Sequence, residues 1–136
     1  MTDAPYRVAH VSEIGTPQRE EPGRARWRAV RRHFGIGSFG IAAYTAGAAG
    51  EVFTGDHTEA DTRHEELFFV ASGRAAISVA GETVDAPAGT FVHVPDPEVV
   101  RGATALEPGT TLVAVGGEPG KAFVVSAWER RYEDDA

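Results

Sequence analysis

Residues 50–95 read GEVFTGDHTEADTRHEELFFVASGRAAISVAGETVDAPAGTFVHVP and hold the densest group of metal-capable side chains in the chain. These side chains come from one polar segment and are His57, Glu59, Asp61, His64, Glu65 and Glu66. The apolar run 67–70 follows at once, so a polar loop leads directly into an apolar strand. A loop of this kind can present ligands at the mouth of a β-barrel, and a pocket is expected where it meets the strand.

Glycine and proline recur at regular spacings after this loop. Six residues separate Glu66 from Gly73, five separate Gly81 from Pro87, one separates Pro87 from Gly89, and five separate Gly89 from Pro95. Short apolar runs divided by such turns are typical of an antiparallel sandwich or barrel. The spacing resembles that of the cupin superfamily, and the resemblance covers roughly residues 50–115.

The resemblance implies an all-β fold, a cupin-like antiparallel β-barrel of the double-stranded β-helix or jelly-roll type. It also implies a divalent metal held by two histidines and a glutamate from a first motif and a histidine from a second. Glu66 occupies the position of the first motif's glutamate, and the sequence 57–59 is similar to its His-x-His, with Glu59 as the last residue. The histidine position of the second motif falls on Val100, which cannot bind a metal.

The candidate metal ligands are His57, Glu59, His64 and Glu66. Six residues separate Glu59 from Glu66, where the family usually has three or four, so His64 can substitute for a missing ligand. Residues two apart in an extended segment share a face, which pairs His57 with Glu59 and His64 with Glu66. Two imidazoles and two carboxylates suit zinc, manganese, iron or nickel. The alternative is a solvated loop whose carboxylates pair with Arg63.

Three further residues are candidates for the pocket: Phe68, His93 and Arg101. Phe68 lies two residues after Glu66 and is expected to fill the interior beneath it. The neighbours of His93 on both sides are apolar, so alternation does not decide which face it occupies. Arg101 either binds a ligand carboxylate with its planar guanidinium, or pairs with Glu66, or lies on the surface.

Strands are expected over residues 24–29, 38–45, 51–55, 66–71, 74–80, 83–85, 90–94, 99–104, 110–115 and 122–125. The first alternates arginine with Ala25, Trp27 and Ala29, a pattern that predicts an edge strand. The glycines between residues 35 and 40 predict bulges or a tight bend. Ser126 and Glu129 form a capping-box pattern, which predicts a short C-terminal helix that closes one side of the barrel with aromatic residues.

Composition limits the classes of partner. The 136 residues suit one domain, with an arm and edge strand at 1–32, the barrel at 33–125 and a helix and tail at 126–136. A net charge of −7 argues against nucleic acid, which favours basic surfaces. The chain has no cysteine, no signal peptide is recognised, and no apolar run is long enough to span a bilayer. We therefore expect a cytoplasmic protein with no membrane partner.

Two classes of function stay open. In the first, the barrel is a small-molecule-binding module, with or without a metal at its mouth. In the second, it is a metal-dependent enzyme, an oxygenase or an isomerase, that acts on a small organic substrate. The absence of the second-motif histidine favours binding. The resemblance also implies a homodimer.

Overall fold

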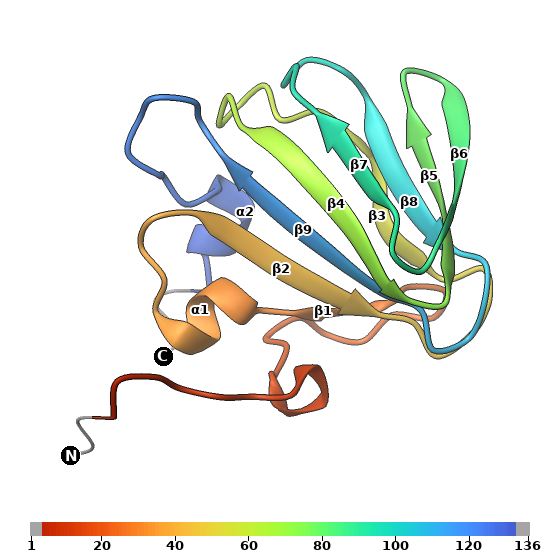
Figure 1. The fold of residues 1–136 in the computed structure, drawn as a ribbon, viewed down its shortest axis with the longest axis horizontal. Helices are drawn as coiled ribbons and strands as arrows, with labels where there is room; N and C mark the ends of the chain where they lie inside the picture. The colour runs from red at the N-terminus through yellow and green to blue at the C-terminus, as the bar shows by residue number, and fades with distance from the viewer. Residues whose placement is uncertain (1–3, 133–136) are drawn as a thin grey trace.

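In the computed structural model, which describes residues 4–132, nine strands form two antiparallel sheets (Figure 1). The five-stranded sheet has the order β1 (Arg26–Arg28), β2 (Gly40–Thr45), β9 (Thr111–Gly117), β4 (Glu65–Ser72) and β7 (Phe91–Val94). The four-stranded sheet has the order β3 (Val52–His57), β8 (Arg101–Ala105), β5 (Arg74–Val79) and β6 (Glu82–Pro87). This architecture confirms the predicted cupin-like fold, although the two sheets do not close into a continuous barrel.

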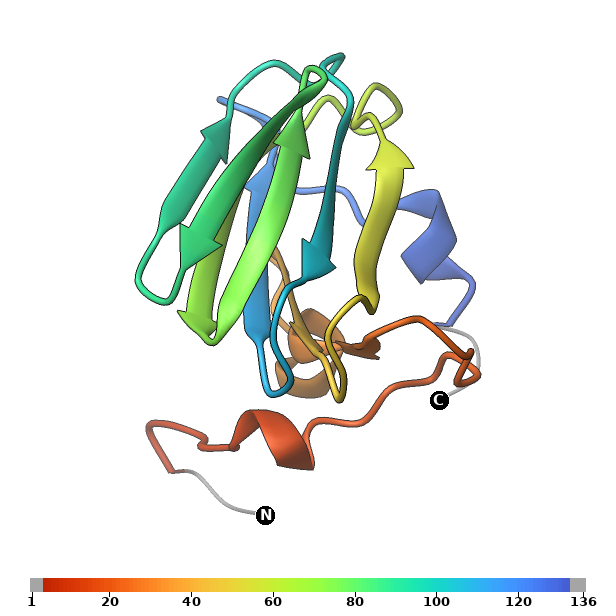
Figure 2. The same cartoon turned by 90° about the vertical axis from the view of Figure 1, so that its right-hand side faces the viewer.

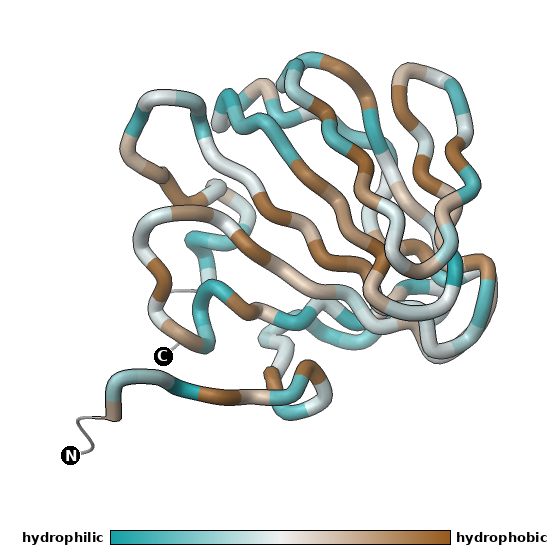
Figure 3. Tube along the Cα trace, viewed as in Figure 1, coloured by the Kyte–Doolittle hydropathy of each residue, from teal (hydrophilic) through white to brown (hydrophobic). Residues whose placement is uncertain are grey.

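The core lies between the sheets and follows the alternation of each strand. Phe68 and Val70 from β4, Leu112 from β9 and Ile77 from β5 are all 0% exposed. Hydrophobic residues accordingly mark the central strands, whereas the connecting loops are largely hydrophilic (Figure 3). The inward direction of Phe68 also fixes the direction of Glu66, two residues earlier on the same strand.

The turn between β4 and β5 requires glycine at position 73. Gly73 has a φ of 74°, and a Cβ placed there would lie 2.2 Å from the Thr110 hydroxyl and 2.7 Å from the Thr110 Cα. Thr110 is itself 0% exposed, and its Oγ1 accepts a hydrogen bond from the Arg74 N–H at 3.0 Å. The glycine expected from the spacing therefore lets the start of β9 approach the turn.

Helices form only short segments in the described part of the chain: the 3-10 helix η1 (Val11–Glu13) and the α-helices α1 (Val30–Phe34) and α2 (Ala127–Arg130). None of them is long and apolar enough to cross a membrane. Helix α1 was not expected from the sequence; it ends at Gly35 in the left-handed conformation, with a φ of 70°. That glycine terminates a helix and does not form the predicted bulge.

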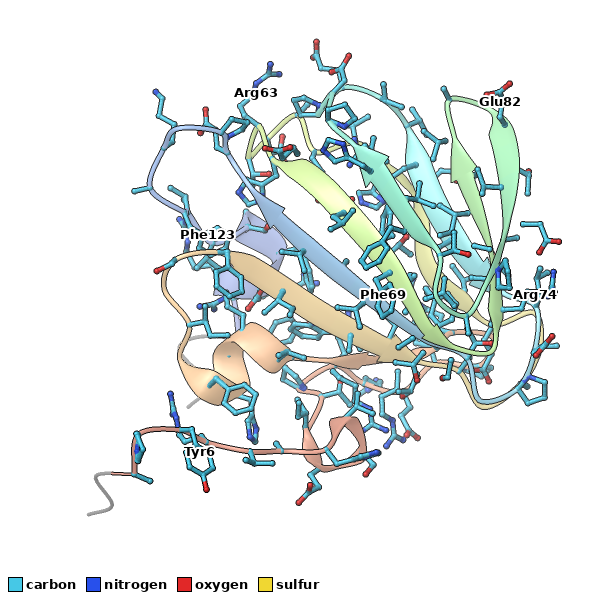
Figure 4. All side chains as sticks on the ribbon, viewed as in Figure 1. Tyr6, Arg63, Phe69, Arg74, Glu82 and Phe123 are labelled. Atoms are coloured by element: carbon cyan, nitrogen blue, oxygen red, sulfur yellow. The ribbon has the colours of Figure 1, made fainter. Side chains whose placement is uncertain are left out.

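The C-terminal segment differs from expectation in two details. Residues 122–125 form no strand; Phe123 instead lies beside β2, where a Cβ on Gly40 would be 3.0 Å from its ring (Figure 4). The capping box is not formed, because Ser126 makes no side-chain cap and the Glu129 carboxylate pairs with Arg31 at 2.9 Å. Glu129, which the sequence suggested as part of a cap, thus connects α2 to α1 through its ion pair with Arg31.

Helix α2 lies behind β2 and β9 in Figure 1, and the turned view in Figure 2 places it on the side of the molecule where β3 is the edge strand of its sheet. Trp27, which is 2% exposed, contacts Trp128 and Tyr132 with ring-centroid distances of 4.8 and 5.5 Å. Arg32 on α1 also donates to the backbone oxygen of Tyr132. The aromatic closure predicted for the C-terminal helix is therefore present.

Candidate metal and ligand site

A cavity of about 690 Å³ opens between the inner face of β2, strand β3 and the C-terminal segment. Tyr44 contributes to its wall from β2, His57 from the end of β3, Glu66 from the start of β4, and Phe123 and Trp128 from the C-terminal segment. The cavity thus draws its wall from both sheets, and α2 covers part of it. This is a volume suited to a small organic molecule.

Three metal-capable side chains converge on this wall. His57, Glu59 and Glu66 each offer one ligand atom, and these atoms all lie within 4.8 Å of one another. The backbone of the loop after β3 is held by a hydrogen bond from the Glu59 N–H to the Pro97 oxygen at 2.7 Å. Because Glu66 belongs to a paired strand, at least two of the three positions have a backbone fixed by the fold.

The tautomer of His57 favours a role as a ligand. Its Nδ1 lies 2.8 Å from the backbone oxygen of Gly55, which can only accept a hydrogen bond. Nδ1 must therefore carry a proton, so Nε2 is the ring nitrogen that a metal ion would bind. In metal sites, a hydrogen bond from one ring nitrogen of a histidine to a backbone carbonyl commonly orients the other nitrogen toward the metal.

Arg101 lies behind Glu66 and is 0% exposed. Its Nη1 donates to Glu66 Oε1 at 3.0 Å, its Nε to the Val99 oxygen at 2.8 Å and its Nη2 to the Asp96 oxygen at 2.8 Å. The arginine therefore holds one oxygen of Glu66 and leaves the other available. Of the three alternatives for Arg101, the structure shows pairing with Glu66.

The electrostatics of the cluster favour bringing in positive charge. Burial raises the pKa of Glu59 above its usual 4.5, and the Glu66 charge raises it further, against the lowering effects of His57, Arg101 and His64. Burial also raises the pKa of Glu66, although the Arg101 hydrogen bond and the His57 charge oppose this. In both residues the net shift disfavours the carboxylate, so a bound cation would relieve an existing cost.

The structure does not bring every candidate residue into the cluster. His64 is 5% exposed and lines the cavity, but it lies outside the group of three, with its ring 5.4 Å from that of Phe123. Phe68 fills the core beneath Glu66 as expected but does not line the cavity. Arg101 also lies away from the cavity wall, because Glu66 stands between them.

His93 faces away from the cavity. In the register of β4 with β7 it lies opposite Leu67, on the outer face, and its Nε2 is 2.9 Å from Glu65 Oε1. The side chain is 53% exposed. Its proposed place in the pocket is thus corrected, because Val92 and Val94 occupy the inward positions of that strand.

In the second motif, the residue that points inward is not the one at the position of the family's histidine. Val100, at the position of the motif's histidine, is 47% exposed, whereas the next residue, Arg101, points inward and reaches Glu66. A guanidinium therefore occupies the region in which the resemblance implies a fourth metal ligand. Any metal at this site would have three ligands from the described part of the chain.

Tyr44 was not anticipated from the sequence as a residue of the cavity wall. Tyr44 is 9% exposed, and burial raises the pKa of its phenol above the usual range, with the charges of Glu66 and Glu59 adding to the effect. The signal in the sequence was weak because the residues on both sides of Tyr44 in β2 are small or apolar. Its inward direction follows only from the sheet.

Solved structures share this architecture. A conserved protein with a double-stranded β-helix domain from Klebsiella pneumoniae is 21% identical, with a TM-score of 0.62, over 86% of this chain and 93% of that one. A cupin protein from Bacteroides fragilis is 14% identical, with a TM-score of 0.60, over 82% and 90%. This chain has the cupin fold. A third cupin-fold neighbour, Streptomyces PAC13 with uridine, is 15% identical, with a TM-score of 0.56, over 88% and 83%.

The resemblance to cupins predicted from residues 50–115 is thereby confirmed at the level of the fold. No family model matches the chain, and no curated protein matches it in sequence. The cupin fold hosts sites of different chemistry, so the function has to be argued from the residues of this cavity.

Proposed function

We propose that the cavity binds a small organic molecule beside a divalent metal ion held by His57, Glu59 and Glu66. The observation that carries this proposal is the convergence of one imidazole and two carboxylates within 4.8 Å on the wall of a cavity of about 690 Å³. Zinc, manganese, iron and nickel all accept such a mixed nitrogen and oxygen set. Three protein ligands leave coordination positions for a bound molecule.

The residues present fit a metal ion. His57 offers Nε2 because its Nδ1 faces the Gly55 oxygen. Burial raises the pKa of both carboxylates, so a bound cation would stabilise their charged forms. Arg101 already donates to one oxygen of Glu66. When bound, the ion would supply Lewis acidity to a ligand oxygen.

The chain's own groups would then position the bound molecule. Arg101 fixes the orientation of Glu66, and Tyr44 presents a protonated phenol to the cavity wall. Phe123 and Trp128 provide an apolar wall on the side of the C-terminal segment. These features support selective binding of a molecule with both polar and apolar parts.

Metal content tests this proposal directly. We expect protein purified without added metal, or reconstituted with Mn²⁺ or Zn²⁺, to hold close to one equivalent by elemental analysis. His57→Gln and Glu59→Gln should lose it, whereas His93→Gln, a control on the outer face, should keep it. Less than about a tenth of an equivalent in the reconstituted parent, where a real site would saturate, would contradict a metal site.

A metal-dependent enzyme, an oxygenase or isomerase, is the second candidate. It is favoured by the open coordination positions, which are the mark of catalytic sites in metalloproteins. Oxygen uptake by the iron-loaded protein, and solvent deuterium incorporation into a bound carbonyl compound, would each detect such turnover. Their absence, together with saturable ligand binding, would support the binding module.

The homodimer implied by the resemblance is part of the same proposal. Light scattering coupled to gel filtration should give twice the chain mass at micromolar concentration. A monomer under these conditions would contradict the homodimer and leave the metal proposal untouched.

A further inference from the structure

Two arginines line the cavity without an acidic partner. Arg24 and Arg131 belong to the wall of the 690 Å³ cavity and also to that of an adjoining cavity of about 830 Å³, together with Gln18 and Trp27. Among residues 4–132, the Arg24 guanidinium has no hydrogen-bonding or ionic partner, and that of Arg131 contacts only the Tyr132 ring, at 5.3 Å. Both residues are exposed, so their guanidinium groups present solvent-accessible donors at the junction of the two cavities.

The nearby acids are mostly engaged elsewhere. Glu20 pairs with Arg26, Glu129 pairs with Arg31, and Glu51 Oε1 accepts a hydrogen bond from the Gly47 N–H at 2.9 Å. Outside the metal-capable cluster, Glu21 and Asp61 are the acids of these two walls that have no partner in the described part of the chain, and Asp56 accepts a hydrogen bond from the Ser78 hydroxyl. Neither aspartate lines the adjoining cavity, so neither lies at the junction. In a protein with a net charge of −7, this junction is therefore a local excess of positive charge.

The cavity is consequently polarised. His57, Glu59 and Glu66 form its acidic part, and the two arginines form its basic part. Tyr44 is within electrostatic reach of both, because the Glu66 and Glu59 charges raise the pKa of its phenol whereas the Arg24 charge lowers it. A molecule that fills the cavity would meet both parts.

We propose that Arg24 and Arg131 bind an anionic group, a carboxylate or a phosphate, of a small molecule whose other end reaches the His57, Glu59 and Glu66 cluster. This inference rests on the proposed function and names its substrate class as a small organic anion. The planar guanidinium donates paired hydrogen bonds to either anion. The buried Trp27 provides the apolar wall beside it.

Calorimetric titration of the full chain tests the site with three probes: succinate, inorganic phosphate and the uncharged succinamide. We expect an anion to bind and succinamide not to bind, and the tighter of the two anions identifies the preferred group. Arg24→Gln and Arg131→Gln should each weaken binding about tenfold or more, the effect of losing one charge-assisted hydrogen bond. Arg130→Gln is the matched control, because Arg130 lines neither cavity and donates instead to the Val125 oxygen.

Metal content, measured on the same samples, separates this inference from the proposed function. Both arginine variants should keep the parent's metal content and thermal midpoint while losing anion affinity. Anion binding that depends on Arg24 in a protein that holds no metal would support the anion site and contradict the metal site. Binding of neither anion, or an unchanged affinity in Arg24→Gln, would overturn the anion site.

A further variant locates the bound anion. Arg19 lines only the adjoining cavity, so Arg19→Gln should leave the affinity within about twofold of the parent, as expected for a distant and screened charge. A loss equal to that of Arg24→Gln would place the anion in the adjoining cavity and overturn the inference.

Discussion

Glu59 carries a charge that the folded protein disfavours in the absence of a cation. Its pKa is raised above 4.5, the value expected in the unfolded chain, by burial and by Glu66. The folded state therefore binds more protons than the unfolded state between pH 4.5 and the raised pKa. This contribution to stability is fully present below pH 4.5 and is lost as the pH rises through the raised pKa.

We therefore expect Glu59→Gln to raise the free energy of unfolding of the metal-free protein at neutral pH and to flatten its decline above pH 4.5. Urea unfolding of chelator-treated protein at several pH values measures both effects. Added Mn²⁺ should stabilise the parent but not the variant. A variant less stable than the metal-free parent at pH 7 would contradict the account of the cluster.

Glu66 and Arg101 form a pair whose side chains are 12% and 0% exposed. Glu66→Gln leaves a buried guanidinium without its carboxylate and should lower the free energy of unfolding by roughly 3–5 kcal/mol. Arg101→Met should lower it by a similar amount, because the Glu66 carboxylate then lacks its guanidinium partner. The double variant should cost clearly less than the sum of the two, and additive losses would show that the two side chains act independently.

At the level of single elements, the β4–β5 turn depends on close approach as well as on backbone conformation. Gly73→Ala places a Cβ in contact with the Thr110 backbone at a φ of 74°. It should lower the free energy of unfolding by more than about 2 kcal/mol. Gly81→Ala is the control, because it has a similar φ of 82° but nothing within 4 Å. Gly81→Ala should lower the free energy of unfolding only by the penalty for a positive φ, about 1–2 kcal/mol. Equal losses, measured by thermal unfolding, would contradict the steric account.

At the level of the whole molecule, the contact between α1 and α2 holds in place a helix that lines the cavity. Arg31 and Glu129 are 8% and 12% exposed as side chains, so their ion pair is largely buried, and Glu129→Gln removes its ionic part. Because α2 has only four residues, Glu129→Gln should release it locally and not unfold the sheets. Hydrogen exchange in residues 127–132 should accelerate about tenfold or more, which corresponds to a loss of about 1.4 kcal/mol.

The control for this contact is Glu82→Gln, at the exposed end of β6 (Figure 4). It should leave exchange in residues 127–132 and the thermal midpoint unchanged. Unaltered exchange in Glu129→Gln would mean that the aromatic contacts of Trp27 hold α2 without the ion pair.

Much of the fold was predictable because glycine and proline mark the turns between its strands. Gly73, Gly81 and Gly89 all have a positive φ, which favours glycine at turns, so their spacing indicates the strands between them. Helix α1 was missed because its five residues are too few for a periodic pattern, and its terminating Gly35 resembles a bend. Residues 122–125 are apolar for another reason, since Phe123 covers the cavity.

The site was less predictable because its residues meet only in three dimensions. His57, Glu59 and Glu66 lie near each other in the sequence and were identified, whereas the opposing Tyr44 and Arg24 come from other strands and segments. The alternation of Arg24 with Ala25 predicted an edge strand and did not place Arg24 at a cavity. Distinguishing a cavity wall from an outer face required the register of the sheets.

The contact between Trp27 and Trp128 has a consequence for optical spectroscopy. These are the chain's only two tryptophans, and their rings meet edge to face with centroids 4.8 Å apart. The exciton coupling of the two adjacent indoles in circular dichroism will therefore report the docking of α2, whereas intrinsic fluorescence will report both this docking and the unfolding of β1, which holds the buried Trp27. The two tryptophans of the chain thus lie on the two sides of the contact between β1 and α2.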